Sequence, residues 1–597
     1  MKPEPRMPER RLAQRTVLLL GICCLVPVVL YSPSLRYGFV WDDYDLITTN
    51  QFLVQTNPFE IFARGYWHNP DYAEVEMSYY RPVAVLSHYL DRKIWGLNPF
   101  GFHLSNIVIH AAVSGLLAVI LHRLTGSLPI AILGGLFFGV QPASNSVPVW
   151  VAARNYSLAL ALLLLSFLAL LSGLGRRSRG RLIGFGLGYL FGALASEGAL
   201  VYAAVALVWI GLSRRPGRNY LAWVAVTCAV IPIYLVLRLV MARTPFPPAA
   251  AGRALEYPLS IINVFGQQLL LLLVPFIQKI TYTMNRELTG LSSLTFLGLF
   301  FLIAPLAVAL LKLAPGPSGR SISEAGRLLG LGYVWTVVFL LPFGQLMTLA
   351  ASGRTLYLAV PGVLIFIAGL ARASRPPIWL QKVLLAAGVA CILAFAGQTL
   401  ARNPIWQSQK TLYQALAREA PDSPTGLLHQ GDLLMARGLA DSAIKLFRRA
   451  VTENGSYLPA RELLSRALLH EQRVPEAIPE LQAVVRLDPN NPRAYSDLAL
   501  AQVQLGWLDS AIANFREAAR LDPASPGIRN NLALTLRRAG QFDAAIAEYR
   551  AAVRLAPDSD TTLNNLGQAL LARGDHQEAA SVFRQVLRLN PDFTAAR

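Results

Sequence analysis

Residues 10–45 read RRLAQRTVLLLGICCLVPVVLYSPSLRYGFVWDDYD. Basic residues come first, and an uncharged apolar run from Thr16 to Tyr31 follows them. A helix that crosses a membrane needs about 20 mainly apolar residues, with its basic end on the cytoplasmic side. No small-x-small cleavage site follows the run, so we interpret it as an uncleaved first transmembrane helix rather than a signal peptide.

The composition extends this interpretation to two thirds of the chain. The 597 residues are 54% hydrophobic and 15% charged, with a mean hydropathy of +0.42, whereas soluble domains carry about 25% charged residues. Residues 401–597 hold 23 Lys and Arg against 21 Asp and Glu, which leaves 31 basic and 14 acidic residues for 1–400. We therefore predict a membrane domain over 1–400, a linker over 401–422 and a water-soluble domain over 423–597.

The pattern of apolar runs and basic loops predicts the topology. The loops 176–181 and 214–218 are strongly basic and should face the cytoplasm, so the basic excess orients a membrane protein and does not indicate nucleic-acid binding. The run 261–274 lies between two prolines and is predicted to be re-entrant or interfacial. Eleven spans result, with a cytoplasmic N-terminus and an extracytoplasmic C-terminal third, in the periplasm or a lumen. Beyond the first helix they lie near 103–121, 128–141, 157–174, 182–195, 198–212, 220–241, 291–311, 328–343, 356–371 and 383–399.

The loop over residues 32–102 is then extracytoplasmic and unusually long. It contains eight of the 14 acidic residues of the membrane domain. Long loops on a rigid scaffold often carry function. The eight are Asp42, Asp43, Asp45, Glu60, Asp71, Glu74, Glu76 and Asp91.

The last third repeats with a period of 34 residues. Small residues, prolines and one aromatic or Leu position recur in register, which is typical of tetratricopeptide units made of two antiparallel helices. The second unit is degraded, with Gln472 where its neighbours have Gly. The fold class is therefore all-α: a polytopic membrane helix bundle followed by a tetratricopeptide α-solenoid of about five repeats. The register is visible in Pro489, Pro523, Pro557 and Pro591, in Gly506, Gly540 and Gly574, and in Phe447, Leu481, Phe515, Tyr549 and Phe583.

The residues with candidate chemistry fall into three groups. Adjacent Asp42 and Asp43 could act as a general base, with Asp43 slightly favoured and Asp42 assisting. They could equally ligate a divalent cation or form a solvated acidic turn; no other cofactor or metal site is indicated. Basic side chains predicted near the outer face could bind a lipid phosphate, or could be structural: Arg81, His103, Arg154 and Arg354. Asn residues on first helices of the repeats could hold an extended peptide, or be solvated: Asn531, Asn564 and Asn565.

Several short motifs together resemble the transmembrane and tetratricopeptide-repeat-containing mannosyltransferases, a family of C-type glycosyltransferases. The matching pieces are Phe39-Val40-Trp41-Asp42-Asp43, Tyr80-Arg81-Pro82, Asn98-Pro99 with Gly101-Phe102-His103, and Arg354-Thr355-Leu356-Tyr357-Leu358. The resemblance implies transfer of a sugar, mannose in the family, from a polyprenyl phosphate to a protein acceptor outside the cytoplasm. It also implies that an aspartate after the first helix deprotonates the acceptor hydroxyl.

The chain departs from the family pattern in two places. Gln141-Pro142-Ala143-Ser144-Asn145 stands where a His-Pro-x-His-Thr-Glu stretch is common, and Ser196-Glu197 lacks the Lys of a Ser-Lys-Glu stretch. The alternative hypothesis is a non-catalytic, membrane-anchored repeat scaffold for envelope or secretory proteins. A transporter is not supported, because no paired broken helices mark a midplane site.

Overall fold

The computed structural model divides into two compact units, Met1–Ala415 and Leu416–Arg597. It describes residues 9–50, 52–63, 79–174, 178–213, 220–241, 258–274, 293–313, 322–340, 353–374, 376–419, 421–453, 455 and 457–590. Within these residues the regular structure is helical throughout, and no strand occurs. This confirms the predicted all-α fold class.

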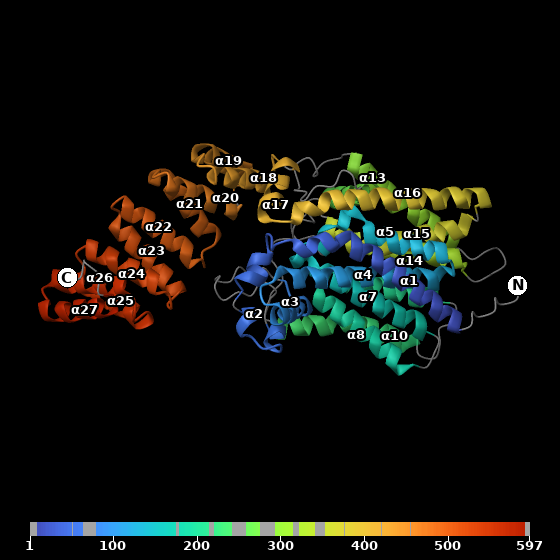
Figure 1. Cartoon of the computed structure of the whole chain (residues 1–597), viewed down its shortest axis with the longest axis horizontal. Coiled ribbons are helices and arrows are strands. Elements are labelled where there is room, and N and C mark those ends of the chain that lie inside the picture. Colours follow the sequence, from blue (N-terminus) through green and yellow to red (C-terminus); the bar gives the residue numbers. More distant parts are fainter. Residues whose placement is uncertain are drawn as a thin grey trace. The chain divides into compact units, whose positions relative to one another are not determined.

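The first unit is a bundle of long apolar helices joined by short 3-10 and π segments. Long helices run side by side in it (Figure 1), and α1 packs on both α4 and α5. The helices are α1 Glu9–Tyr31, α2 Phe52–Gln55, α3 Pro82–Trp95, α4 Pro99–Thr125, α5 Leu128–Val140, α6 Ser146–Val149, α7 Arg154–Gly173, α8 Arg179–Ala195, α9 Tyr202–Leu212, α10 Tyr220–Val236, α12 Pro258–Leu273, α13 Ser293–Leu313, α14 Glu324–Leu340, α15 Gly353–Ser374, α16 Ile378–Arg402 and α17 Gln409–Glu419. The short segments are η1 Ser32–Arg36, η2 Tyr44–Thr48, η3 Glu60–Ala63, η4 Pro142–Ser144, η5 Val151–Ala153, η6 Glu197–Val201, η7 Leu237–Met241 and η10 Asn403–Trp406.

Small residues let the first helices of the bundle approach closely. A Cβ added at Gly115 of α4 would lie 2.7 Å from Cys24 Sγ, and one at Gly135 of α5 would lie 2.8 Å from Cys23 Sγ. Ser114 donates its hydroxyl to the Cys23 carbonyl at 2.8 Å, which satisfies a polar group inside the apolar core. The cysteines thus serve as small packing residues, as buried free cysteines commonly do.

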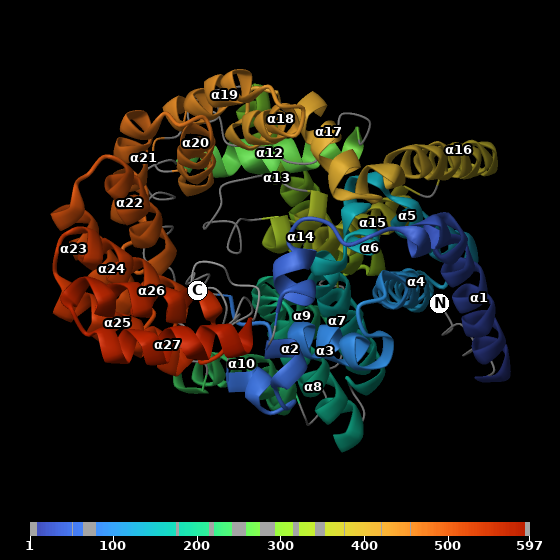
Figure 2. The ribbon, with the colours of Figure 1, turned by 60° about the vertical axis from the view of Figure 1, so that its left-hand side comes forward.

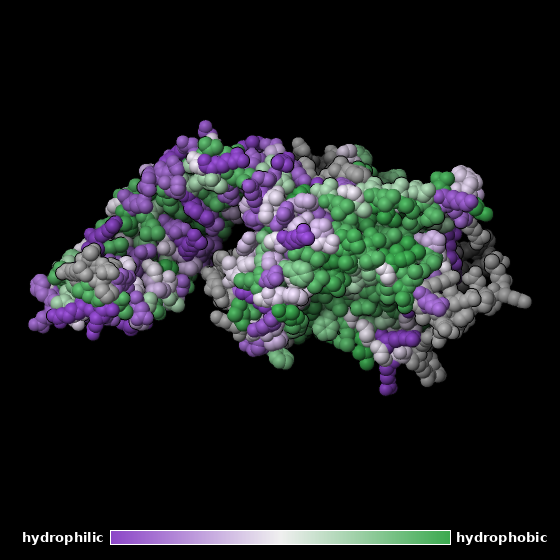
Figure 3. Space-filling view, viewed as in Figure 1, coloured by the Kyte–Doolittle hydropathy of each residue, from purple (hydrophilic) through white to green (hydrophobic). Residues whose placement is uncertain are grey.

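The outer face of this bundle is hydrophobic over a broad area, as a membrane-facing surface requires (Figure 3). Among the described residues, seven helices are long and apolar enough to cross a membrane, and the bent pair Leu128–Val140 and Pro142–Val149 makes up to eight. Three of the eleven expected spans form shorter helices there: α8, the Glu197–Leu212 pair and α14. The apolar runs therefore form helices, but within the described residues these three are shorter than the roughly 20 residues of a span.

Part of the expected topology falls outside the described residues. This applies to the basic loop 214–218, to Arg176 and Arg177 of the loop 176–181, and to the acidic residues Asp71, Glu74 and Glu76. The candidate re-entrant run coincides with α12, a helix of 16 residues. Its length is below the roughly 20 residues that a span needs.

The second unit is a regular series of helix pairs that curves into an arc (Figure 2). Each helix packs on the next along the chain. The helices are α18 Pro424–Met435, α19 Ala440–Glu453, α20 Leu458–His470, α21 Val474–Leu487, α22 Pro492–Gln504, α23 Leu508–Leu521, α24 Pro526–Arg538, α25 Phe542–Leu555, α26 Asp560–Arg573 and α27 His576–Leu589. The array confirms the tetratricopeptide interpretation of the period.

The turn inside each unit explains the recurring glycine. Gly506, Gly540 and Gly574 have φ of 77°, 77° and 101°, the left-handed conformation that ends a helix without the steric cost of a Cβ. In the degraded second unit Gln472 occupies the same turn with φ 57°. The repeat geometry therefore overrides the local preference of glutamine.

The presence of glutamine where the other units have glycine predicts that Gln472→Gly stabilises the array. A non-glycine residue in the left-handed region costs about 1–2 kcal/mol, and glycine removes that cost. We expect a higher melting temperature by circular dichroism for Gln472→Gly, and a lower one for the reverse change Gly506→Gln. Equal melting temperatures for both variants and the wild type would contradict the idea.

Candidate active site

The carboxylate of Asp43 fastens the segment that follows α1. Its Oδ2 accepts the backbone N–H of Val40 at 3.0 Å, and its Oδ1 accepts that of Ala152, at 2.7 Å, from η5. The side chain is fully buried. Burial raises the pKa of Asp43 to about 8; the two N–H bonds and Arg154 oppose this rise, and Asp42 adds to it. Asp43 is thus occupied in holding two chain segments together.

Asp42, the residue before Asp43, is less buried than Asp43. Its side chain is half-buried, so it remains accessible to another molecule. The neighbouring Trp41 stacks on Trp150 with ring centroids 5.4 Å apart. Of the two candidate carboxylates, Asp42 is therefore the more exposed, and Asp43 is the one that backbone N–H groups engage.

Arg154 occupies a buried polar centre beneath this segment. Its Nη1 lies 2.6 Å from Asp91 Oδ2, and its Nε donates to Asn106 Oδ1 at 2.6 Å. Its Nη2 donates to the Phe102 carbonyl at 2.8 Å. With 1% of its surface exposed, Arg154 joins α3, α4 and α7. The structure therefore engages this arginine within the chain, where the sequence suggested a phosphate ligand.

The two histidines near Arg154 are also buried. His103 of α4 places its Nε2 3.4 Å from the Gly38 carbonyl, so it supports the backbone just before the Asp42–Asp43 pair. Among the described residues, His88 of α3 has no hydrogen-bond partner for either ring nitrogen. Burial and the charge of Arg154 hold the pKa of His88 well below its ordinary value. A neutral His88 avoids a second positive charge beside Arg154.

Arg81 and Arg354 each lie over an aromatic ring. Arg81 lies 4.2 Å from the centre of the Tyr79 ring, and its Nε lies 2.6 Å from Glu197 Oε2. Burial raises the pKa of the Tyr79 hydroxyl, while the charges of Arg81 and Arg354 both lower it. Arg354 also lies 4.6 Å from the Trp150 ring centre. The two arginines thus lie against different rings, Tyr79 and Trp150.

Glu197 is the residue of this cluster that sequence reasoning did not assign. Its Oε1 accepts the Tyr80 N–H at 2.7 Å while Oε2 pairs with Arg81. It thereby orients the start of α3 from η6. Its isolation in the sequence could have marked it as a candidate, because no other acidic residue occurs between Asp91 and Glu256.

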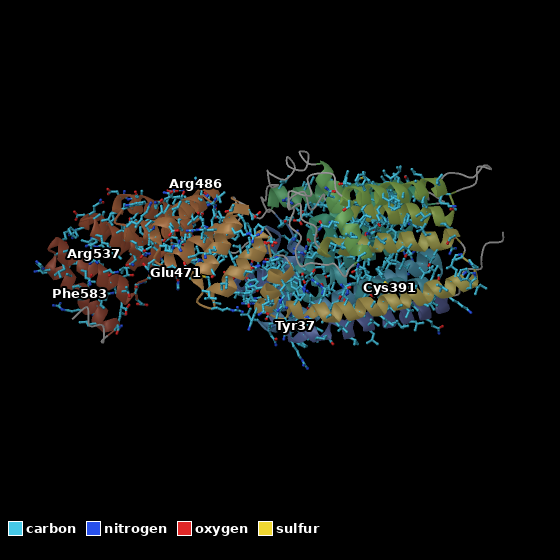
Figure 4. The ribbon with its side chains drawn as sticks, turned by 90° about the horizontal axis from the view of Figure 1, so that it is seen from above. Tyr37, Cys391, Glu471, Arg486, Arg537 and Phe583 are labelled. Atoms are coloured by element: carbon cyan, nitrogen blue, oxygen red, sulfur yellow. The ribbon has the colours of Figure 1, made fainter. Side chains whose placement is uncertain are left out.

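The three predicted asparagines of the repeats lie on first helices of consecutive units. Asn531 is on α24, and Asn564 and Asn565 are on α26, which packs against α24. Asn565 donates to Asn530 Oδ1 at 3.1 Å, and the buried Oδ1 of Asn564 has no partner in the part of the chain that the structure describes. Arg537, labelled in Figure 4, donates to Gln568 at 2.7 Å across the same two helices. These helices therefore present a strip of amide and guanidinium groups.

Metal-ligating side chains do not cluster in the described part of the chain: no three His, Cys, Asp or Glu residues there could hold a metal ion together. The suggestion that Asp42 and Asp43 ligate a divalent cation therefore gains no third ligand from these residues. It stays a prediction.

Comparison with known proteins gives two kinds of match. Tetratricopeptide-repeat family models match residues 407–459, 434–503, 492–525 and 530–592. The crystal structure of MamA protein is 22% identical, with a TM-score of 0.28, and the match covers 29% of this chain and 93% of that chain.

Curated relatives match the chain more widely. Protein O-mannosyl-transferase TMTC3 from Mus musculus is 23% identical over 547 residues, 83% of this chain and 59% of the relative. Protein O-mannosyl-transferase TMTC2 from Mus musculus is 31% identical over 188 residues, 30% of this chain and 22% of the relative. The chain therefore spans less than two thirds of either relative.

The buried Asp43 carboxyl predicts a pH-dependent stability. Its pKa of about 8 lies above the ordinary 3.8, so the folded chain binds more protons than the unfolded chain between these values. The free energy of unfolding contributed by Asp43 therefore falls as pH rises through this window. We expect the melting temperature of the wild type to fall relative to Asp43→Asn between about pH 5 and 9. Asp42→Asn should retain the wild-type fall, and parallel curves for wild type and Asp43→Asn would contradict the assignment.

The motifs, the helix bundle and the repeat units lead to the same group of proteins. This chain, with apolar helices followed by a tetratricopeptide array, is similar to the protein O-mannosyl-transferases named TMTC2 and TMTC3.

Proposed function

We propose that the chain is a membrane glycosyltransferase that modifies proteins, and that it moves mannose from a polyprenyl-phosphate donor to an acceptor hydroxyl. The observation that carries the proposal is made at the Trp150 ring: Trp41, the residue before Asp42, stacks on it, and the Arg354 guanidinium lies over it. Arg81 lies over the ring of Tyr79. A half-buried carboxylate and two arginines are the groups that such a transfer needs. The names of the relatives support the reaction class.

The reaction assigns one role to each group. Asp42 takes the proton of the acceptor hydroxyl, and the hydroxyl oxygen forms a bond to the anomeric carbon. The bond from that carbon to the phosphate oxygen breaks, and the polyprenyl phosphate leaves with the electron pair. Arg354 and Arg81 stabilise the negative charge that develops on the phosphate. The donor arrives within the membrane, so no nucleotide-binding loop is required.

The location of the site agrees with a lipid donor. Tyr37, just before the Asp pair, lies at one end of the bundle, whereas Cys391 of α16 lies farther along it (Figure 4). The basic loops place this end outside the cytoplasm in our topology, with the N-terminus inside and the repeats outside. A lipid phosphate at the membrane surface and a soluble acceptor could meet there.

Loss of a general base and loss of a phosphate ligand should change different kinetic constants. Asp42→Asn should lower kcat by about 10²–10⁴-fold, the usual contribution of a general base. Arg354→Ala should mainly raise KM for the lipid donor, because it removes a partner of the phosphate. Transfer from a mannosyl polyprenyl phosphate in detergent measures both.

The control for this experiment is Arg372→Ala, the same change of charge at the other end of α15. It should leave KM for the donor unchanged. Full turnover of Asp42→Asn would show that Asp42 is not the base, whereas a wild type that transfers no sugar would favour the alternative function, a non-catalytic scaffold that only binds proteins.

The asparagines of α24 and α26 are proposed to hold the acceptor as an extended peptide. Their amides can pair with peptide N–H and C=O groups, and repeat arrays commonly bind peptides in this way. Alanine at Asn531, Asn564 and Asn565 together should raise KM for a long peptide acceptor about tenfold or more, at 0.5–1.5 kcal/mol for each hydrogen bond. A short hydroxyl acceptor should react unchanged.

Asn514→Ala serves as the control for the repeats. Asn514 lies on the second helix α23, where it donates to Gln502 at 2.8 Å. Its replacement should affect neither acceptor. Equal losses of the triple variant for the long and the short acceptor would rule out a role of this strip in capture.

A further inference from the structure

The segment 403–413, here called the strap, packs against the chain around Asp42. It follows α16 directly and belongs to the first unit. Asn403 donates its Nδ2 to the Leu30 carbonyl at 3.3 Å, and the Gln407 carbonyl accepts the Gly38 N–H at 3.1 Å. The ring of Trp406 lies 5.5 Å from that of Trp150, with 21° between the planes. Residues expected to form a linker thus fasten the segment that carries the base.

Trp41 has a backbone conformation that requires such support. Its φ is 53°, in the left-handed region that bulky residues rarely adopt. Two contacts hold it there: its N–H donates to Gln409 Oε1 at 2.7 Å, and its ring stacks on Trp150. The Gln409 amide is oriented in turn, because its Nε2 donates to the Tyr413 hydroxyl.

The conformation of Trp41 decides where Asp42 points. Asp42 is the next residue, and Asp43 beyond it is fixed by its two backbone N–H bonds. Between the fixed Asp43 and the tied Gly38, Trp41 is the residue whose rotation would redirect the Asp42 carboxylate. Trp150 lies against both Trp41 and Trp406 and also against Arg354, so the base and the phosphate ligand share one support.

We propose that the strap positions Asp42 and that Gln409 is a positioning residue of the transfer reaction, 368 residues from Trp41 in sequence. This inference rests on the proposed function. Gln409 acts through a side-chain oxygen, whereas Gln407 acts through its backbone carbonyl. Removal of the Gln409 side chain should therefore break the contact with Trp41. Removal of the Gln407 side chain should leave the backbone contact with Gly38 intact, although both are glutamines of the same strap.

The test compares Gln409→Ala with Gln407→Ala in the full chain in detergent. Gln409→Ala should lower kcat by about 10- to 100-fold with KM for donor and acceptor nearly unchanged, because a misplacement of about 1 Å can cost about 100-fold. Gln407→Ala should match the wild type. Gln409→Glu should recover most of kcat, since a carboxylate oxygen can accept the Trp41 N–H and the Tyr413 hydroxyl can donate to the other oxygen.

Hydrogen exchange gives a second measurement that needs no activity. Peptides that cover residues 38–46 should exchange faster in Gln409→Ala than in Gln407→Ala. Faster exchange with full turnover would overturn the positioning role, and unchanged exchange would overturn the contact itself. A wild type that transfers no sugar would refute the proposed function, while the exchange comparison would still decide whether Gln409 holds Trp41.

Discussion

The buried ion pair between Arg154 and Asp91 is the contact on which the candidate site depends. Its charged atoms lie 2.6 Å apart and almost entirely out of solvent. Removing one partner of such a pair leaves an uncompensated charge and typically costs about 3–5 kcal/mol. Asn106 and the Phe102 carbonyl occupy further donors of the guanidinium. Because these partners come from three helices, the pair sets how α3, α4 and α7 meet.

The segments that carry the candidate chemistry are built on this frame. Ala152 lies two residues before Arg154 and binds Asp43 through its N–H. Trp150 lies four residues before Arg154 and stacks with Trp41 and Trp406. The start of α7 therefore determines where the outer segment and the strap can lie. Fixing the groups before the substrates bind reduces the reorganisation that the reaction requires.

The repeat array follows a different principle. Its contacts connect neighbouring helices, so each unit depends mainly on the next. The turn at Gln472 illustrates the consequence. A poor local residue is tolerated because Ala477 and Leu481 beside it still fill the core between helices. Cooperativity between neighbours thus preserves the register even where one position departs from the pattern.

Periodicity and hydropathy in the sequence were sufficient to predict the fold class. The 34-residue period and the apolar runs depend on contacts within a helix or between adjacent helices, so the local pattern already contains them. The first residues of α8, α9 and α14 lie three or four residues from the expected starts, because helix ends depend on turns and on packing with other segments. The contacts of the strap, residues 403–413, were not predictable either, because they join residues far apart in the chain.

The roles of the charged residues were decided by the tertiary structure. Sequence analysis identified Asp42 and Asp43 as a pair and four basic residues as candidates, but could not distinguish them. The fold buries Asp43 and Arg154 in internal contacts, leaves Asp42 half-buried, and brings Arg81 to Tyr79 and Arg354 to Trp150. Burial and partners determine whether a charge is structural or available, and both arise from contacts between residues far apart in the chain.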